Sequence, residues 1–182
     1  MRALVLYESM FGNTHAIASS IADGLATGLD VTLTEISDAP RGLPDDVDVL
    51  VVGGPTHAFG LSRPSTRQDA AQQAGRDPDE VESGLREWLA GLGPVDRSVP
   101  AAAFDTRVRR PRVPGSAAHR AAAKLRRLGF ATLDGPTTFW VGGTSGPILD
   151  GELERARQWG EQLAAGIASP HRSGAGHEPR QD

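Results

Sequence analysis

Short apolar runs alternate along the chain with segments of helical periodicity. Residues 2–7 (Arg-Ala-Leu-Val-Leu-Tyr) form a continuous apolar run, typical of a strand buried on both faces. Ile17, Ile21 and Leu25 then recur at four-residue intervals. This spacing predicts a helix with one apolar face that ends near Gly28.

The next segments predict an edge strand, a connection and a central strand. Residues 30–36 alternate apolar and polar positions, which favours a strand at the edge of a sheet. Residues 38–46 read as a connection with a short helical turn, and residues 48–53 are the most strand-like segment of the chain. A long loop over residues 54–77 is expected to follow. Pro78 then suits the first position of a helix.

The second half repeats the alternation of helix and strand. The helix from Pro78 is predicted to bury one stripe, made of Val81, Leu85, Trp88, Leu89 and Leu92. Residues 99–104 are small and apolar and predict a strand. A second long loop over residues 105–115 is expected to lead into a helix from about Ser116 to Leu128.

The chain is expected to end in an interrupted strand, a helix and a tail. Residues 130–143 predict a last strand that is broken at Asp134-Gly135-Pro136. The final helix is predicted to bury Leu153, Ala156, Gly160, Leu163 and Ile167 on one face. Residues 169–182 lack large apolar side chains and are expected to form a flexible tail.

Five strands separated by helices predict an α/β fold with three αβα layers and a doubly wound parallel sheet. We expect one domain over residues 1–168, followed by the flexible tail 169–182. The pattern does not fix the order of the strands. In such sheets ligands bind at the carboxyl ends of the strands, so the loops after the first, third and fourth strands are the candidate sites.

Composition excludes several classes of protein. The chain has no cysteine, which rules out disulfides, thiolate catalysis and thiolate-held metals. Its net charge of −4 gives no general attraction to nucleic acid. No apolar run is long enough to span a membrane or to form a signal peptide, so we expect a cytoplasmic protein. The histidines have no ligand spacing, and no metal site is predicted.

Residues 9–14 (Ser-Met-Phe-Gly-Asn-Thr) form a polar turn between the first strand and the first helix. Their hydroxyls, amide and backbone N–H groups lie at a helix N-terminus, where unpaired donors and the helix dipole favour an anion. The turn contains no Lys or Arg and so lacks the lysine of the Walker phosphate loop, and it does not match the GxGxxG fingerprint of dinucleotide sites. The alternative is an ordinary helix cap, for which these residue types are also typical.

The stretch YESMFGNTHAIASSIADGL resembles the first strand, phosphate loop and first helix of the flavodoxin family. DVLVVGGPTHAFG is similar to the third strand and first flavin loop of that family, and AAAFDTRVRRPRVPGSAAHRAAAKLRRLGF to the fourth strand, second flavin loop and next helix. The resemblance implies a sheet of order 2-1-3-4-5 with noncovalent FMN at the switch point.

The resemblance also implies which residues would hold the cofactor. The 5′-phosphate would be bound by the polar turn, namely Ser9, Met10, Phe11, Gly12, Asn13 and Thr14. One side of the isoalloxazine would be lined by Pro55, Thr56, His57, Ala58, Phe59 and Gly60. The other side would be approached by Asp105, Thr106 and Arg107.

The second flavin loop departs from the family pattern. It has no Tyr or Trp and instead carries Arg107, Arg109, Arg110 and Arg112. Loss of an aromatic partner is expected to weaken FMN binding by about 0.5–1.5 kcal/mol. An arginine stacked on the ring would favour the anionic reduced flavin. The alternative is a solvated basic face.

The sequence therefore predicts an FMN-binding redox protein of flavodoxin-like fold. Two roles remain open: electron transfer with a partner protein, or reduction of a small quinone-type molecule by an FMN-dependent oxidoreductase. In the second role His57 is a candidate proton donor, and its alternative role is packing. A third possibility is a flavodoxin-fold binding module that has lost FMN. Oligomeric state is not assigned.

Overall fold

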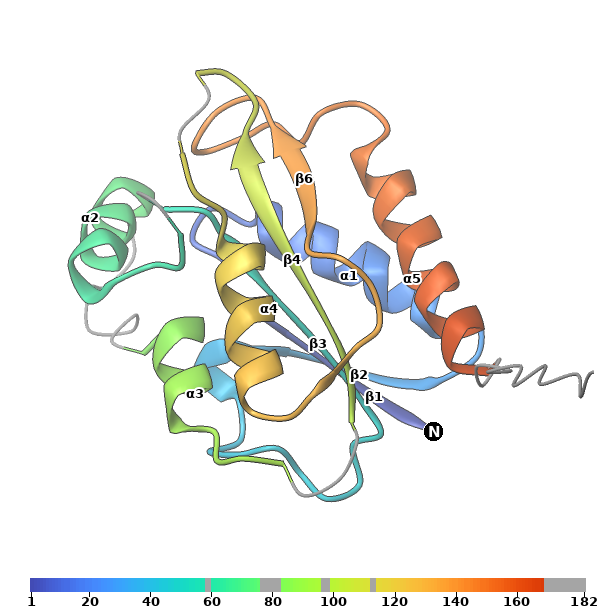
Figure 1. Cartoon of the computed structure of the whole chain (residues 1–182). Helices are drawn as coiled ribbons and strands as arrows, with labels where there is room; N and C mark the ends of the chain where they lie inside the picture. Colours follow the sequence, from blue (N-terminus) through green and yellow to red (C-terminus); the bar gives the residue numbers. More distant parts are fainter. Residues whose placement is uncertain (58–59, 76–82, 96–98, 112–113, 169–182) are drawn as a thin grey trace, which may run out of the picture.

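A computed structural model describes residues 1–57, 60–75, 83–95, 99–111 and 114–168. The predicted tail, Ala58, Phe59, Pro78, Val81 and Arg112 lie outside the described residues. A parallel sheet of order β2-β1-β3-β4-β5 forms the middle layer, and β6 also pairs with β4 (Figure 1). This confirms the expected order and the edge position of β2.

The elements follow one another as predicted, with one added helix. The strands are β1 Arg2–Tyr7, β2 Asp30–Glu35, β3 Val49–Pro55, β4 Pro100–Val108, β5 Ala131–Thr132 and β6 Thr137–Val141. The helices are α1 Asn13–Leu25, the short η1 Ile36–Asp38, α2 Pro64–Ala74, α3 Leu85–Gly91, α4 Ala117–Arg127 and α5 Glu152–Ala168.

The side chains of each central strand alternate between two cores. Ala3 and Val5 of β1 face the core that α1 and α5 cover, whereas Leu4 and Leu6 face the core beneath α3 and α4. Both faces of the sheet are thus buried, as Figure 1 shows. This burial explains why β1 and β3 read as continuous apolar runs.

The predicted interruption of the last strand is confirmed. β5 and β6 both pair with β4, and Asp134-Gly135-Pro136 lies between them. β6 gives the far half of β4 a partner from Phe104 to Val108. The prediction that the loop begins at residue 105 was therefore wrong: β4 continues to Val108 because hydrogen-bonding partners lie on its edge.

The predicted loop over residues 54–77 was also wrong, because it contains α2. Pro64 is at the start of this helix, and the Thr66 hydroxyl accepts from the Arg63 amide at 2.9 Å. Gly75, at φ +68°, ends the helix. α2 has no large apolar stripe. It buries Arg67, Ala70 and Ala71, so hydrophobic periodicity could not reveal it.

α3 begins at Leu85, later than the predicted start near Pro78, since Gly84 is extended. Its predicted stripe is confirmed at Leu85, Trp88, Leu89 and Leu92, which are all buried. On α5, Leu153 is 45% exposed, so its predicted burial was wrong.

Helices α1 and α5 pack unusually closely through glycine. A Cβ on Gly160 would lie 2.3 Å from the Ile21 carbonyl oxygen, and one on Gly24 would lie 2.0 Å from the Arg157 carbonyl oxygen. Both obstacles are backbone atoms, which cannot turn aside. Only glycine allows this approach, which holds α1 against the sheet.

We therefore predict that Gly160→Ala destabilises the chain by about 1–3 kcal/mol, because the added methyl forces the two helices apart. Gly166→Ala is the matched control on the same helix, since no atom lies within 4 Å of its Cβ position. The control is expected to be neutral or to stabilise by up to about 1 kcal/mol. Urea unfolding measures both changes. Equal stability of the two variants would contradict the prediction.

Candidate functional site

The polar turn between β1 and α1 has a glycine at the N-cap position, so the residue at that position offers the helical amides no side-chain hydrogen bond. Gly12 precedes α1 in the left-handed conformation at φ +82°, and no side chain caps the helix from that position. The Ser9 hydroxyl accepts from the His15 amide, in the first turn of α1, at 3.3 Å. The turn therefore presents backbone donors and the positive end of the helix dipole at the carboxyl end of β1.

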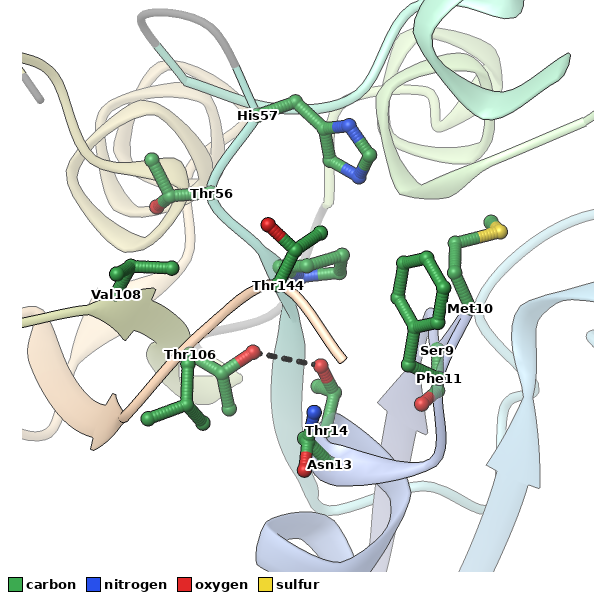
Figure 2. A pocket seen from close by; sticks show the side chains of 12 residues that line it. Ser9, Met10, Phe11, Asn13, Thr14, Thr56, His57, Thr106, Val108 and Thr144 are labelled. Carbon is green, nitrogen blue, oxygen red and sulfur yellow. Dashed lines mark hydrogen bonds between the residues drawn. The ribbon is translucent and has the colours of Figure 1, made fainter. Parts of the chain in front are cut away.

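A pair of hydroxyls ties this turn to the middle of the sheet. Thr14 Oγ1 and Thr106 Oγ1 lie 2.8 Å apart, and both residues are buried (Figure 2). Thr14 comes from the first turn of α1 and Thr106 from β4. The bond fixes the helix N-terminus relative to the carboxyl end of β4.

Three loops and the end of β4 enclose a cavity of about 230 Å³. Five hydroxyl side chains, one amide, one imidazole and five apolar residues line it: Ser9, Met10, Phe11, Asn13, Thr14, Pro55, Thr56, His57, Thr106, Val108, Val141 and Thr144. Among the described residues, none that lines the cavity is Asp, Glu, Lys or Arg. Figure 2 shows Met10 and Phe11 on one side of the cavity and Val108 on the opposite side. An anion here would be held by neutral donors.

The buried carboxylate of Asp105 organises the loops around the cavity. Its Oδ2 accepts from the Thr56 hydroxyl at 2.8 Å, the Ser116 hydroxyl at 2.6 Å and the Ala118 amide at 3.1 Å. Thr56 Oγ1 in turn accepts from the Ala117 amide at 2.9 Å. Asp105 thus joins the loop after β3 to the start of α4.

His57 projects into the cavity from a tight turn (Figure 2). Its backbone exchanges two hydrogen bonds with Gly60, at 2.9 and 2.8 Å. Burial lowers the pKa of His57, and the positive charge of Arg67 lowers this pKa further. The imidazole is therefore neutral at pH 7 and offers both a donor and an acceptor.

A buried polar cluster lies beneath this loop and includes Arg67, whose exposed fraction is 0%. Arg67 Nη1 donates to the Ser62 hydroxyl at 3.0 Å and pairs with Glu87 Oε2 at 3.0 Å. Glu8 Oε2 accepts from the Leu85 amide at 2.9 Å. Burial raises the pKa of Glu8, although hydrogen bonds from Ser62 and Leu85 and the charge of Arg67 oppose this rise.

Nine of the residues predicted for the site line the cavity together, namely Ser9, Met10, Phe11, Asn13, Thr14, Pro55, Thr56, His57 and Thr106. Gly12, Gly60, Asp105 and Arg107 are not among the lining residues. Gly12 shapes the turn, Gly60 closes the His57 turn and Asp105 faces α4. Ala58 and Phe59 lie outside the described residues.

Three lining residues were not predicted as cofactor ligands. Val108 and Val141 are paired at the ends of β4 and β6, and Thr144 follows β6. The feature of the sequence that points to Thr144 is the glycine-rich segment 142–147, which contains it. A Cβ on Gly146 would lie 2.8 Å from Asn13 Oδ1, so this segment closes over the polar turn.

Arg107 is held beside the cavity by an aromatic contact. Its guanidinium carbon lies 5.6 Å from the centre of the Trp140 ring, and Arg107 and Trp140 are paired in β4 and β6. Side chains alternate along a strand, so Arg107 projects to the face opposite Val108. This contact orients one arginine of the second loop away from the lining.

The sequence model of the family described as Flavodoxin matches residues 5–95, which carry the polar turn, His57 and α2. The chain belongs to the flavodoxin family. No curated protein matches it in sequence. Among the described residues, no helix is both long and apolar enough to cross a membrane, and no three His, Asp or Glu side chains gather as metal ligands.

Solved structures of flavodoxins share the fold. A flavodoxin from the domain Archaea is 21% identical with a TM-score of 0.64, covering 93% of this chain and 100% of that one. Flavodoxin 1 from Bacillus cereus is 17% identical with a TM-score of 0.63, covering 91% and 98%. A flavodoxin, WrbA-like protein from Agrobacterium tumefaciens is 19% identical with a TM-score of 0.54, covering 90% and 95%.

The cofactor of flavodoxins is FMN, and the cavity suits it. The N-terminus of α1 and the adjacent hydroxyls are donors of the type that a phosphate ester needs. Apolar walls from Pro55, Val108 and Val141 suit a flat, largely apolar ring system. The residues present therefore fit the cofactor of the family.

We predict that His57 makes the apoflavodoxin less stable as the pH falls. Because the folded pKa of His57 is lowered from 6.5, the unfolded chain takes up its proton first. The contribution of neutral His57 to the free energy of unfolding is fully present above pH 6.5 and is lost as the pH falls towards the pKa of His57 in the folded chain. Between about pH 7 and 5.5, urea unfolding should show a larger loss of stability in the wild type than in His57→Gln.

His15→Gln is the matched control, because His15 is exposed and lies outside the cavity. If His57 is the group responsible, the loss between about pH 7 and 5.5 should change in His57→Gln and persist in His15→Gln. Parallel losses of stability in the wild type and in His57→Gln would show that His57 is not the group responsible.

Proposed function

We propose that this flavodoxin transfers electrons to and from a partner protein through noncovalently bound FMN. The observation that carries the proposal is the cavity at the carboxyl end of the sheet, where the N-terminus of α1 and several neutral donors meet apolar walls. The bound FMN would supply one-electron and two-electron redox chemistry. The chain would bind it, orient it and limit access of water.

The phosphate is assigned to the polar turn. Ser9 and Thr14 would donate hydroxyl hydrogen bonds, and the first amides of α1 would bind the remaining oxygens. Thr14 is already oriented by Thr106, at 2.8 Å, so little side-chain entropy is lost on binding. Met10, packed against Ala70 and Ala71 of α2, closes one side of the site.

The ring system is assigned to the apolar part of the cavity. Pro55 and His57 would lie on one side of it, and Val108 and Val141 on the other. Valines provide less stacking area than an aromatic residue, which supports weaker binding than in a flavodoxin with an aromatic pair.

A second candidate is reduction of a small quinone-type acceptor, which His57 favours. Its neutral ring lines the cavity and can donate a hydrogen bond to a carbonyl oxygen. The proton needed by the reduced acceptor would reach that oxygen from His57, with replacement from water. The third reading, a fold that has lost FMN, has less support because the full set of neutral donors is present.

We predict that Ser9→Ala weakens FMN binding about tenfold, because one hydrogen bond to a charged phosphate is removed. Ser20→Ala is the matched control, since Ser20 lies on α1 but bonds to the Ala16 carbonyl oxygen outside the cavity. Quenching of flavin fluorescence by the apoprotein measures both constants. The proposal is wrong if the wild type takes up no FMN at high micromolar concentration, or if both variants bind FMN equally.

Rapid mixing distinguishes the two redox roles. Direct oxidation of NAD(P)H, or fast two-electron reduction of a quinone that slows in His57→Gln, would support the small-molecule reductase. Electron transfer to a cytochrome without turnover of either small molecule would support the protein carrier.

A further inference from the structure

Arginines gather around the end of β4 and the start of α4, beside the cavity. Between Thr106 and Leu133 the sequence has eight Lys or Arg and no Asp or Glu, although the whole chain has 23 Asp or Glu. Four of these cations lie at the cavity end of the described structure: Arg107, Arg109, Arg110 and Arg120. We call these four residues the basic rim.

The basic rim is positioned by the structure. Arg107 is held over Trp140 at 5.6 Å, and the Arg109 amide donates to the Val141 carbonyl oxygen at 3.0 Å. Arg107 and Arg109 flank Val108, which lines the cavity. A Cβ on Gly60 would lie 3.1 Å from Arg120 Cγ, so Arg120 packs against the turn that carries His57. The rim therefore borders two walls of the cavity.

Most of these charges are not used within the fold. Arg109, Arg110 and Arg120 are exposed, and no carboxylate of the described residues lies within 4.0 Å of them. The arginines of α5 differ, because Arg155 pairs with Glu152, and Arg157 pairs with Glu154 and Glu161. The two arginines of α5 are thus paired with acids, whereas Arg109, Arg110 and Arg120 have no acid partner among the described residues.

The remaining cations of α4 have a structural explanation that the rim lacks. Lys124, Arg126 and Arg127 lie in the last turn of α4, where positive charge stabilises the helix C-terminus. Arg120 lies in the first half of the same helix, where the dipole disfavours a cation. The helix dipole therefore gives no structural reason for a cation at this position, unlike the cations of the last turn.

We propose that the basic rim is the docking surface for a redox protein that carries acidic residues around its own redox centre. This inference rests on the proposed carrier function and names the charge of the partner. Opposite charges bordering both redox sites would steer the two proteins together with the cavity at the centre of the contact. Such complexes are weak and salt-sensitive, which suits a carrier that must be released.

The test is titration of the FMN-loaded chain with an acidic b-type cytochrome, followed by NMR, at about 20 and 200 mM salt. We expect binding at low salt that weakens at least about tenfold at high salt, with shifts centred on the rim. A basic c-type cytochrome, used as the reverse probe, should not bind.

Charge reversal gives the matched comparison. Arg109→Glu/Arg110→Glu should weaken binding at least about tenfold. Arg126→Glu/Arg127→Glu changes the net charge equally, but it lies at the other end of α4, an 11-residue helix about 16 Å long. The two double variants are compared at about 0.1 M salt, where the screening length of about 10 Å is shorter than this distance, so the control should lose no more than about threefold.

The docking surface would be overturned by equal losses of binding in the two double variants. It would also be overturned if binding did not change with salt, or if the acidic cytochrome did not bind. Tighter, rim-dependent binding of RNA or of anionic phospholipid vesicles would also overturn it. FMN titration of the same preparations tests cofactor binding, and with it the carrier function, separately. The cytochrome titration is also repeated on the apoprotein, which tests docking in the absence of FMN. If the chain takes up FMN but does not bind the acidic cytochrome, only the proposed docking surface is wrong.

Discussion

Two consecutive residues of β4 hold the site together, because neighbouring side chains of a strand project to opposite faces. Asp105 faces α4 and gathers the Thr56 hydroxyl, the Ser116 hydroxyl and the Ala118 amide on one carboxylate oxygen. Thr106 faces the other way and meets the hydroxyl of Thr14 at 2.8 Å. Hydrogen bonds to side chains of the same strand therefore position the loop after β3, the start of α4 and the polar turn before α1. A buried carboxylate without these partners would cost several kcal/mol, because an ion taken out of water must be compensated by hydrogen bonds or opposite charge, so the loops are strongly constrained.

Charge is distributed so that the cavity is neutral while its surroundings are not. The lining supplies hydroxyls, an amide and a neutral imidazole, which bind an anion without fixing a counter-ion in the site. Cations lie outside on the basic rim, while Glu8 and Arg67 are buried and do not line the cavity. Binding of the cofactor and recognition of a partner are thus assigned to different groups. A change of surface charge can alter the choice of partner while the polar turn keeps its donors.

The sequence predicted those parts of the fold that depend on apolar periodicity and on turn chemistry. The central strands, α1 and the broken last strand were visible because large apolar residues or glycine and proline mark them. α2 was missed because its buried face consists of Arg67 and two alanines, which no hydrophobic pattern detects. The extension of β4 depends on β6, which is distant in sequence. For the same reason, the sequence located Asp105 near the site but not its role: that role follows from contacts with Thr56 and Ser116 on other elements.

The burial of Arg67 explains how a helix without an apolar stripe keeps its place. Its guanidinium contacts Ser62 and Glu87, and a Cβ on Gly84 would lie 2.5 Å from Nη1, so the group is enclosed by both flanking segments. Hydrogen bonds and ion pairs are directional, whereas the contacts of Ala70 and Ala71 with Met10 are not. The cluster therefore sets the register of α2, and α2 in turn sets the position of Met10 beside the polar turn. Burial is the main cause of the lowered pKa of His57, and the charge of Arg67 lowers it further, so this buried cation affects both one cavity wall and the protonation of the imidazole on the next.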